Sequence, residues 1–383
     1  MNTTLNRLHR DERGMSYVFV GVGFMAFLAA TTLAIDVGMF MTARAQAQNA
    51  ADAGALAGAV ALYYDDYDNR SASGPAVQNA IMAGRANQVM GQAPSINPED
   101  VTFPVGPTGL NNRVKVIVHR SDARSNPLLT FTGRFFGVPQ ADVRAEATAE
   151  ASPANAMTCV KPFTIPDKWI ERQTPPWDPD DTFDVVDNKG NPLPNPDIYI
   201  PSTETGYTGY NADRDRGVEL MIRAGTGNNI TPSFYFSYAI GGYSGADEYR
   251  WNIANCNTTV MGFGDLLLAE PGNMVGPTMQ GIDELIAKDP GAYWDTTLNK
   301  PVSTMNPSPR VVAIPLYDPI YYDTGKRNGR EADLKVANYM GFFITRRQGN
   351  NVYGRITPIS GIIAGNMGPA PVGAFPMAIR LVE

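Results

Sequence analysis

A long apolar stretch lies near the start of the chain. Residues 15–35, MSYVFVGVGFMAFLAATTLAI, contain no charged side chain. Because an α-helix rises about 1.5 Å per residue, a helix over this stretch is about 30 Å long. That length matches the hydrocarbon core of a bilayer, which takes about 20 apolar residues to cross. The pattern therefore predicts one transmembrane helix over residues 15–35, in contact with membrane lipid.

The helical pattern continues past the apolar stretch, because residues 42–62 are rich in alanine and lack proline. Small residues recur there every three or four positions, which places them on one helix face. The spacing of Gly54 and Gly58 matches the small-xxx-small packing motif. Such a face either packs on the chain's own module or assembles laterally with similar helices, and both interpretations stay open. The predicted helix-packing interface consists of Ala43, Ala47, Ala50, Gly54, Gly58 and Ala61.

The next hundred residues combine helical and strand patterns. Residues 76–92 have the pattern of a helix, and residues 113–119 and 141–151 alternate between apolar and polar side chains with the period of a strand. Residues 126–137 hold an apolar patch at helical spacing, with Leu128, Leu129, Phe131, Phe135 and Phe136. We therefore expect residues 36–151 to form a helix-plus-sheet module.

Beyond residue 152 the chain is rich in proline, glycine and aromatic residues, and short strand candidates are separated by turn signals such as DNKGNP and RQGNN. One helical pattern, residues 278–287, interrupts them. We expect a β-rich domain over residues 152–383, and hence an α+β fold class for the whole chain. The strand candidates are residues 218–224, 233–240, 310–316, 335–345 and 352–359.

The charges that flank the apolar stretch predict its orientation. Arg7, Arg10 and Arg13 precede it, whereas Arg44 is the only basic residue between positions 36 and 69. Basic residues stay on the cytoplasmic side, so residues 1–14 are expected in the cytoplasm and the bulk of the chain in the periplasm or outside the cell. A cleaved signal peptide is the rival interpretation, but its apolar core is about 7 to 15 residues long. A single-pass anchor in the cytoplasmic membrane fits better.

Composition and charge limit the classes of partner and the kinds of site that the chain can have. The chain has 383 residues, of which 43% are hydrophobic and 18% charged, with a net charge of −7. This acidic balance argues against nucleic acid as a partner. The chain has only two cysteines, Cys159 and Cys256, and both lie in the part placed outside the cytoplasm, where a disulfide persists. We expect the two to pair, since neither has a second Cys or His at metal-ligand spacing.

Three segments carry a resemblance to a known family. These are Arg13-Gly14, residues 33–38 (LAIDVG) and residues 48–59 (QNAADAGALAGA). They resemble the N-terminal region of TadG-like Flp pilus assembly proteins of bacterial and archaeal tight-adherence systems. The resemblance covers residues 10–62 and implies a membrane-anchored component that supports pilus assembly. The chain lacks the Asp-x-Ser-x-Ser loop of the von Willebrand A-type domain found in some members. No glutamate follows Gly14 at the position usual in prepilins. The resemblance likewise implies an unprocessed anchor.

The sequence offers little catalytic chemistry. Only His9 and His119 are histidines, and no HExxH, GxSxG, Walker A or GxGxxG pattern is present. We therefore expect no enzyme, no catalytic residue, no cofactor and no metal site. Paired carboxylates still allow glycoside hydrolysis in principle, because that reaction needs no histidine. One acidic cluster lacks the spacing of a calcium loop and is interpreted as a solvated loop; it consists of Asp178, Asp180, Asp181, Asp184 and Asp187.

These observations give three functional hypotheses. The first is a membrane-anchored component of a Flp-type pilus assembly system that acts by protein–protein interaction. Its partners would be other pilus assembly proteins or pilin subunits, with self-association through the small-residue face. The second is a pilin-like structural subunit of a surface filament. The third is an anchored extracytoplasmic carbohydrate-active enzyme.

Overall fold

The structure is a computed structural model that describes residues 13–106, 111–187, 189–225, 229–242, 244–327 and 334–382. The expected cytoplasmic segment 1–14 therefore lies almost entirely outside the described residues. The described chain forms two compact units. The first contains residues 13–62, 66–150 and 380–382, and the second contains residues 63–65 and 151–379. Both mix helices and strands, so the predicted α+β fold class is confirmed.

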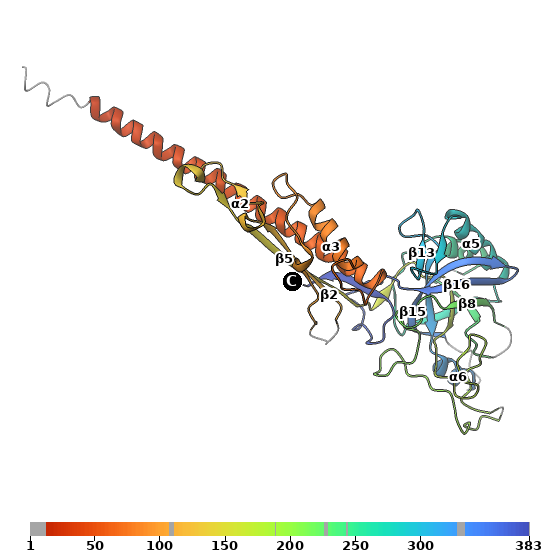
Figure 1. Cartoon of the computed structure of the whole chain (residues 1–383). Coiled ribbons are helices and arrows are strands. Elements are labelled where there is room, and N and C mark those ends of the chain that lie inside the picture. The colour runs from red at the N-terminus through yellow and green to blue at the C-terminus, as the bar shows by residue number, and fades with distance from the viewer. Residues whose placement is uncertain are drawn as a thin grey trace, which may run out of the picture. The chain divides into compact units, whose positions relative to one another are not determined.

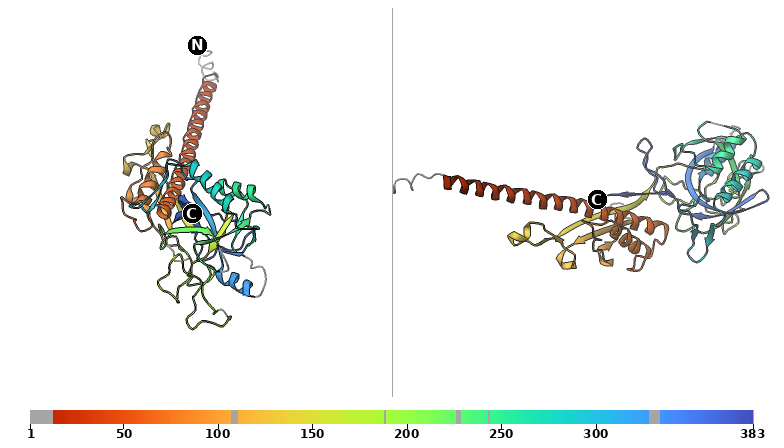
Figure 2. Two further views of the ribbon diagram at one scale, coloured as in Figure 1. Left: turned by 90° about the vertical axis from the view of Figure 1, so that its right-hand side faces the viewer. Right: turned by 90° about the horizontal axis from the view of Figure 1, so that it is seen from above.

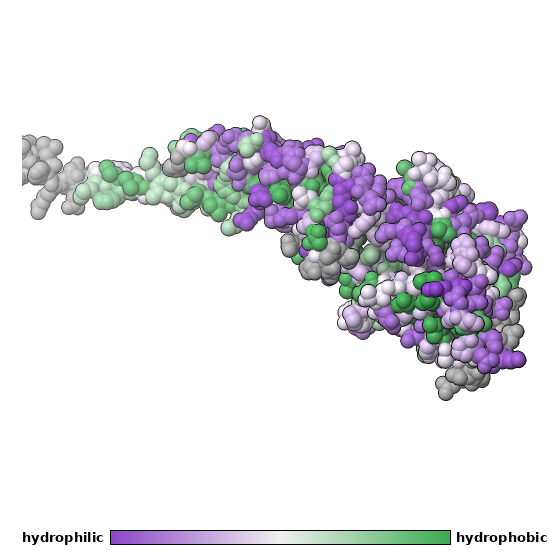
Figure 3. Space-filling view, turned by 60° about the horizontal axis from the view of Figure 1, so that its bottom comes forward, coloured by the Kyte–Doolittle hydropathy of each residue, from purple (hydrophilic) through white to green (hydrophobic). Residues whose placement is uncertain are grey.

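Helix α2, Arg13–Tyr64, is continuous for 52 residues (Figure 1). Its first part is exposed and long and apolar enough to cross a membrane, and hydrophobic side chains cover that part in Figure 3. The two threonine hydroxyls of this first part need no outside partner, because Thr31 and Thr32 donate to the carbonyl oxygens of Phe27 and Leu28 one turn earlier. This suits a lipid environment, where every polar group must be satisfied internally.

The second part of α2 packs within the first unit, against helix α3 and a small sheet. Helix α3 is Pro75–Ala86, and the sheet has the strand order β1-β2-β5-β17. Strands β2 and β5 are antiparallel, and β2 buries every second residue, as its alternation predicted. The strand bounds are β1 Val101–Thr102, β2 Arg113–Arg120, β5 Val143–Pro153 and β17 Met377–Leu381.

Two predictions about this unit need correction. Residues 126–137 are not a helix: they belong to a short hairpin, β3 Leu128–Leu129 and β4 Gln140–Ala141, with the 3-10 turn η3 Gly133–Phe136 between the strands. Prolines and glycines on either side of the apolar residues prevent a regular helix. The predicted helix 76–92 ends at Ala86, because the chain turns there and Met90 and Gly91 adopt positive φ. Two further 3-10 turns complete the unit, η1 Pro98–Asp100 and η2 Asp122–Arg124.

The second unit is built around a sheet that closes on itself. Its strand order is β11-β15-β14-β7-β9-β8-β16, and β16 also pairs with β15 (Figures 1 and 2). All five predicted strands, now β8, β9, β14, β15 and β16, and the predicted helix are present. The seven strands of this sheet are β7 Phe163–Pro166, β8 Glu219–Ala224, β9 Phe234–Ala239, β11 Leu266–Ala269, β14 Val311–Tyr317, β15 Leu334–Gln348 and β16 Asn351–Thr357.

Three helices and two small strand pairs accompany this barrel. The helices are α4 Ala246–Ala254, α5 Val275–Lys288 and α6 Pro319–Arg327. The strand pairs are β6 Ala156–Met157 with β10 Met261–Gly262, and β12 Tyr293–Asp295 with β13 Lys300–Val302. Both faces of the sheet are buried: Ile314 and Leu316 belong to one apolar cluster, and Ala313 and Tyr317 to the other. Such two-sided burial explains why β14 reads as a continuous apolar run.

Candidate functional site

The small-residue face of α2 is buried inside the first unit. All six of its residues, Ala43, Ala47, Ala50, Gly54, Gly58 and Ala61, are covered. A Cβ built on Gly54 would stand 3.0 Å from the carbonyl oxygen of Ala80. One on Gly58 would stand 2.7 Å from Val114 Cγ1. The face therefore contacts α3 and β2 of the same chain. In the described unit it leaves no free surface on which another protein could dock.

A buried carboxylate marks the end of the apolar part of α2. The carboxylate oxygens of Asp36 accept hydrogen bonds from the backbone N–H groups of Phe131 at 2.8 Å, Thr132 at 3.0 Å and Gly133 at 2.8 Å. The Thr132 hydroxyl adds a fourth hydrogen bond at 2.5 Å. It also approaches the carbonyl oxygen of Thr32, one turn earlier in the helix, at 3.2 Å. We call residues 128–141 the exit loop, because this loop is fastened to α2 directly after the predicted span.

The exit loop is also held by its own hydrogen bonds. The Thr130 hydroxyl donates to the carbonyl oxygen of Val138 at 2.6 Å, and the Val138 N–H donates to the carbonyl oxygen of Gly133 at 2.9 Å. Gly137 closes the turn with φ +81°, a conformation that glycine adopts without strain. The loop is thus a compact structure that Asp36 connects to the helix.

The two cysteines lie together at the end of α4. Cys159 and Cys256 form a disulfide. Beside it, buried Lys161 donates to the carbonyl oxygens of Asn255 at 2.8 Å and Asn252 at 3.3 Å, and so satisfies acceptors that the helix end leaves open. Burial lowers the pKa of Lys161 to about 7. The lysine and the disulfide both connect the segment before β7 to the end of α4, so their role is structural.

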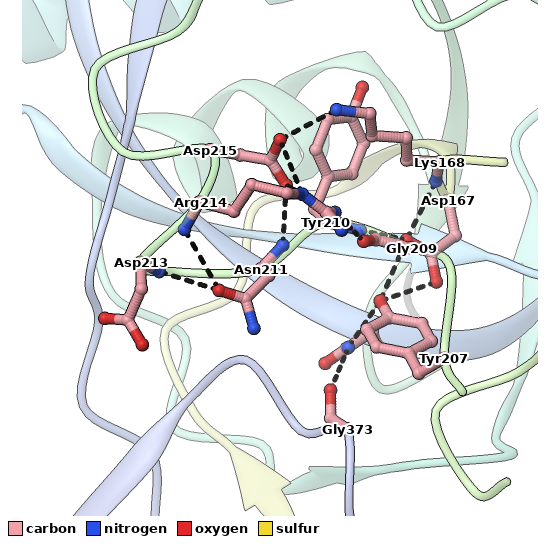
Figure 4. Close-up of polar contacts among 11 residues, drawn as sticks. Asp167, Lys168, Tyr207, Gly209, Tyr210, Asn211, Asp213, Arg214, Asp215 and Gly373 are labelled. Carbon is pink, nitrogen blue, oxygen red and sulfur yellow. Dashed lines mark hydrogen bonds and ion pairs between the residues drawn. The ribbon is translucent and has the colours of Figure 1, made fainter. Parts of the chain in front are cut away.

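The second unit contains a fully buried carboxyl group, Asp167 (Figure 4). It accepts hydrogen bonds from the hydroxyls of Tyr207 at 2.8 Å and Tyr199 at 3.0 Å, and from the backbone N–H groups of Lys168 at 2.9 Å and Tyr210 at 3.1 Å. Burial raises the pKa of Asp167 to about 6, although these donors oppose the rise. The group connects the loop around residues 199–210 to the end of β7.

A second buried carboxylate, Asp215, lies beside this group (Figure 4). It accepts from Lys168 Nζ at 2.7 Å and from Arg214 Nη2 at 2.8 Å. Burial raises the pKa of Asp215, but the hydrogen bonds from Arg214 and Lys168 outweigh it and leave the pKa below its usual value. The Lys168 ammonium also lies 4.4 Å from the ring centre of Trp177. Both carboxyl groups are thus occupied by groups of the chain itself.

A pair of carboxyl groups, Glu171 and Asp197, lies nearby and shares a hydrogen bond. Asp197 also accepts from the backbone N–H groups of Arg172 at 2.8 Å and Asp184 at 2.7 Å. Burial raises the pKa of Asp197 to about 6, and the negative charge of Glu171 adds to the rise. Both side chains are buried and hold backbone groups.

The predicted acidic loop forms turns instead of a cation site. Asp178 and Asp187 accept backbone hydrogen bonds two residues ahead, from Asp180 and Lys189. Among the described residues no group of three or more His, Cys, Asp or Glu side chains is placed to hold a metal ion. Of the cluster Asp178, Asp180, Asp181, Asp184 and Asp187, the carboxylates of Asp178, Asp181 and Asp187 accept hydrogen bonds from their own loop. Asp180 accepts from the Ser233 hydroxyl.

The described geometry gives no support to hydrolytic chemistry. A cavity of about 350 Å³ lies beside β11, and Asp265 is the one carboxyl group in its lining. His119 lies 3.4 Å from Asp100, which also pairs with Arg124 at 2.9 Å. A glycosidase needs two carboxyl groups that face a substrate. Asp167 and Asp197, whose pKa values burial raises, are instead buried against their own loops. Burial also raises the pKa of partly buried Asp184, whose backbone N–H donates to Asp197.

Comparison with known proteins identifies one segment. Residues 14–61 match the family model Tad, described as "Putative Flp pilus-assembly TadE/G-like". The resemblance of the N-terminal region to TadG-like proteins is thereby confirmed. No curated protein and no solved structure matches the chain. The matched segment coincides with α2 and contains Asp36, whose contact with the exit loop the sequence analysis did not predict.

Proposed function

We propose that the chain is a membrane-anchored component of a Flp-type pilus assembly system and that it acts through protein–protein contacts. The observation that carries this proposal is the coincidence of the matched segment, residues 14–61, with a single helix that has two different parts. The first part is exposed, apolar and of membrane-spanning length. The second part is buried in the first unit, so the anchor and the module form one continuous element.

The arginines before the span support an orientation with the N-terminus in the cytoplasm and both units on the other side of the cytoplasmic membrane. The disulfide between Cys159 and Cys256 agrees with this side, where oxidising conditions preserve it. Pilus assembly proteins or pilin subunits would contact the polar surfaces of the two units, because the small-residue face of α2 is already covered.

Cell fractionation followed by N-terminal sequencing tests the proposal. The intact chain is expressed in a cell with a tight-adherence system, the cells are sheared, and membranes and sheared filaments are collected separately. We expect the chain in the membrane fraction with an uncut N-terminus, and cross-linked to pilus assembly proteins. Recovery in soluble fractions would contradict the anchor.

A second candidate is a pilin-like subunit of a filament. It is favoured by one observation, a long N-terminal helix that protrudes and then packs on a small antiparallel sheet. This function predicts recovery of the chain in sheared filaments, with an N-terminus that begins at Met15 after cleavage behind Gly14. The same fractionation therefore separates the two functions.

A further inference from the structure

The exit loop exposes more large apolar side chains than its hydrogen bonding requires. Leu129, Phe131, Phe135 and Val138 are each between 54% and 74% exposed. The backbone N–H groups of Phe131 and Gly133 point to Asp36, and the Thr130 hydroxyl donates within the loop. Exposed apolar groups that gather on one short, hydrogen-bonded loop indicate a contact that the isolated chain does not show.

The position of the loop along α2 is fixed by its contacts. Thr132 reaches the carbonyl oxygen of Thr32, in the last turn of the predicted span, and Asp36 lies one residue beyond the span. Both views of Figure 2 show the loop beside this part of the helix. Any bilayer that surrounds residues 15–35 therefore has its surface at the level of the exit loop.

The apolar surface of α2 continues at the same level. Val37 and Met41 are exposed after Asp36, and the next charged side chain along the helix is Arg44. An acidic residue among apolar neighbours is costly near lipid unless its charge is satisfied. Four donors from the exit loop satisfy Asp36, so its charge no longer prevents the membrane surface from lying close to it.

We propose that the exit loop is a second membrane contact, which inserts Leu129, Phe131, Phe135 and Val138 into the interfacial region of the bilayer. The inference rests on the proposed function, because it takes residues 15–35 as the anchor. Aromatic side chains favour this depth, where one part of a ring contacts acyl chains and the other the headgroups. The guanidinium group of Arg134 lies 5.0 Å from the ring centre of Phe135 and can reach lipid phosphates while the ring is inserted.

Two contacts with one bilayer constrain the anchor more than a lone helix does. A single span is free to rotate about its axis and to tilt, and its packing partners and interfacial anchors limit these motions. The exit loop lies on one side of α2. Its insertion would hold that side of the first unit against the membrane and leave the opposite side facing away. A pilus partner would then meet this unit in one orientation.

Lipid quenching of a site-specific fluorophore tests the proposal. Both native cysteines are bound in the disulfide, so Phe135→Cys or Leu129→Cys provides one free thiol in the full chain. The thiol is labelled with NBD, and the chain is placed in phosphatidylcholine–phosphatidylglycerol nanodiscs, one chain per disc, with or without lipids that carry a nitroxide near the headgroup. We expect a blue shift and a loss of emission with the nitroxide lipids at both positions.

Two further labels make the result decisive. Phe24→Cys, in the exposed part of α2, must be quenched by nitroxides deep in the acyl chains if the anchor is in the bilayer. Met82→Cys, on the exposed face of α3, is the matched control and should keep its emission. Quenching at Phe24 without quenching at Phe135 and Leu129 overturns the exit-loop proposal and leaves the anchor intact. A blue shift at Phe135 that lipid nitroxides do not quench shows a protein contact instead, and also overturns it.

Discussion

Asp36 shows how one side chain can connect distant parts of the chain. It lies within α2, directly after the apolar part, where an unpaired carboxylate would be costly, and it obtains four hydrogen bonds from residues 131–133. Three of the donors are backbone N–H groups, so the pairing depends on the fold of the loop more than on its side chains. The sequence shows the carboxylate and its place, and only the structure shows the loop that binds it.

Replacing this carboxylate should release the exit loop. We expect Asp36→Ala to lower the free energy of unfolding of the first unit, because four hydrogen bonds to a charged group are lost and their donors are left open. Hydrogen exchange of the amides of residues 131–133 in detergent micelles should accelerate strongly. Asp52→Ala is the matched control, since Asp52 lies on the same helix and accepts one side-chain hydrogen bond, from Gln48. An unchanged exchange rate in Asp36→Ala would contradict the role given to this residue.

Asp167 should make the stability of the second unit depend on pH. Its pKa is about 6 in the folded chain and near 3.8 when unfolded. The folded state therefore binds the proton more tightly, so the contribution is fully present below pH 3.8 and disappears as the pH rises through 6. Urea unfolding should show the free energy rising by about 1.4 kcal/mol between pH 7.5 and 5 through this group.

The Asp167→Asn variant checks that assignment. It removes the titrating group while keeping an acceptor oxygen for Tyr207 or Tyr199, so the rise with acidification should become smaller. Asp197 has a pKa shifted in the same direction, and its own variant, Asp197→Asn, should remove a separate part of the rise. An identical pH dependence in the chain and in Asp167→Asn would show that Asp167 does not titrate in this range.

At the scale of elements, regular alternation was the dependable signal. Strand β2 was predicted from its period of two, and α5 from its apolar stripe, because each buries one face. The exit loop was misread as a helix: Phe131 and Phe135 have helical spacing, but Pro127, Gly133 and Pro139 exclude a regular helix. Helix α4 was missed, since its sequence, ADEYRWNIA, has a weak apolar pattern.

The candidate site was predictable only in part. The family resemblance follows from local sequence, and the match to residues 14–61 confirms it. Local sequence also shows that the first part of α2 is long and apolar enough to cross a membrane. The sequence identifies the small-residue face but not its partner: the backbone and side-chain atoms that cover Gly54 and Gly58 come from α3 and β2. Contacts between residues far apart in sequence, such as Asp36 with Thr132, leave no local pattern, so a single sequence does not show them.

The close packing of α2 on the first unit predicts a strong effect of size at Gly58. A Cβ there would already stand 2.7 Å from Val114 Cγ1 and 3.1 Å from Ala80 Cβ. We expect Gly58→Leu to lower the free energy of unfolding of the first unit by about 3 kcal/mol, because the helix must move away from the sheet. Val60→Leu, at an exposed position two residues later, should have little effect. Equal stability of the two variants in thermal unfolding would contradict the packing described here.

At the scale of the whole molecule, the two units are not consecutive segments. Residues 63–65 belong to the second unit although their neighbours on both sides belong to the first, and residues 380–382 return to the first. Within the first unit the returning end is firmly held. Arg380 pairs with Glu150 at 2.8 Å, and the N–H of Val382 donates to the carbonyl oxygen of Thr148 at 2.9 Å. The first unit is therefore completed by the last residues of the described chain.

Removal of residues 380–383 should therefore destabilise the first unit, although these residues follow the whole second unit in sequence. Buried Glu150 would keep its ion pair with Arg113 at 2.9 Å but lose the one with Arg380. The truncation would also remove the last part of strand β17. We expect a loss of about 2 kcal/mol, since buried Glu150 would lose one of its two cationic partners while the Arg380 side chain is half exposed. Hydrogen exchange read by mass spectrometry separates the units: amides of β2 should lose protection, and amides of β14 should not. Arg346→Ala is the control, because its exposed pair with Glu219 lies in the second unit and should contribute little. Equal loss of protection in β2 and β14 would show that the two units unfold together and that the C-terminal residues do not act on the first unit alone.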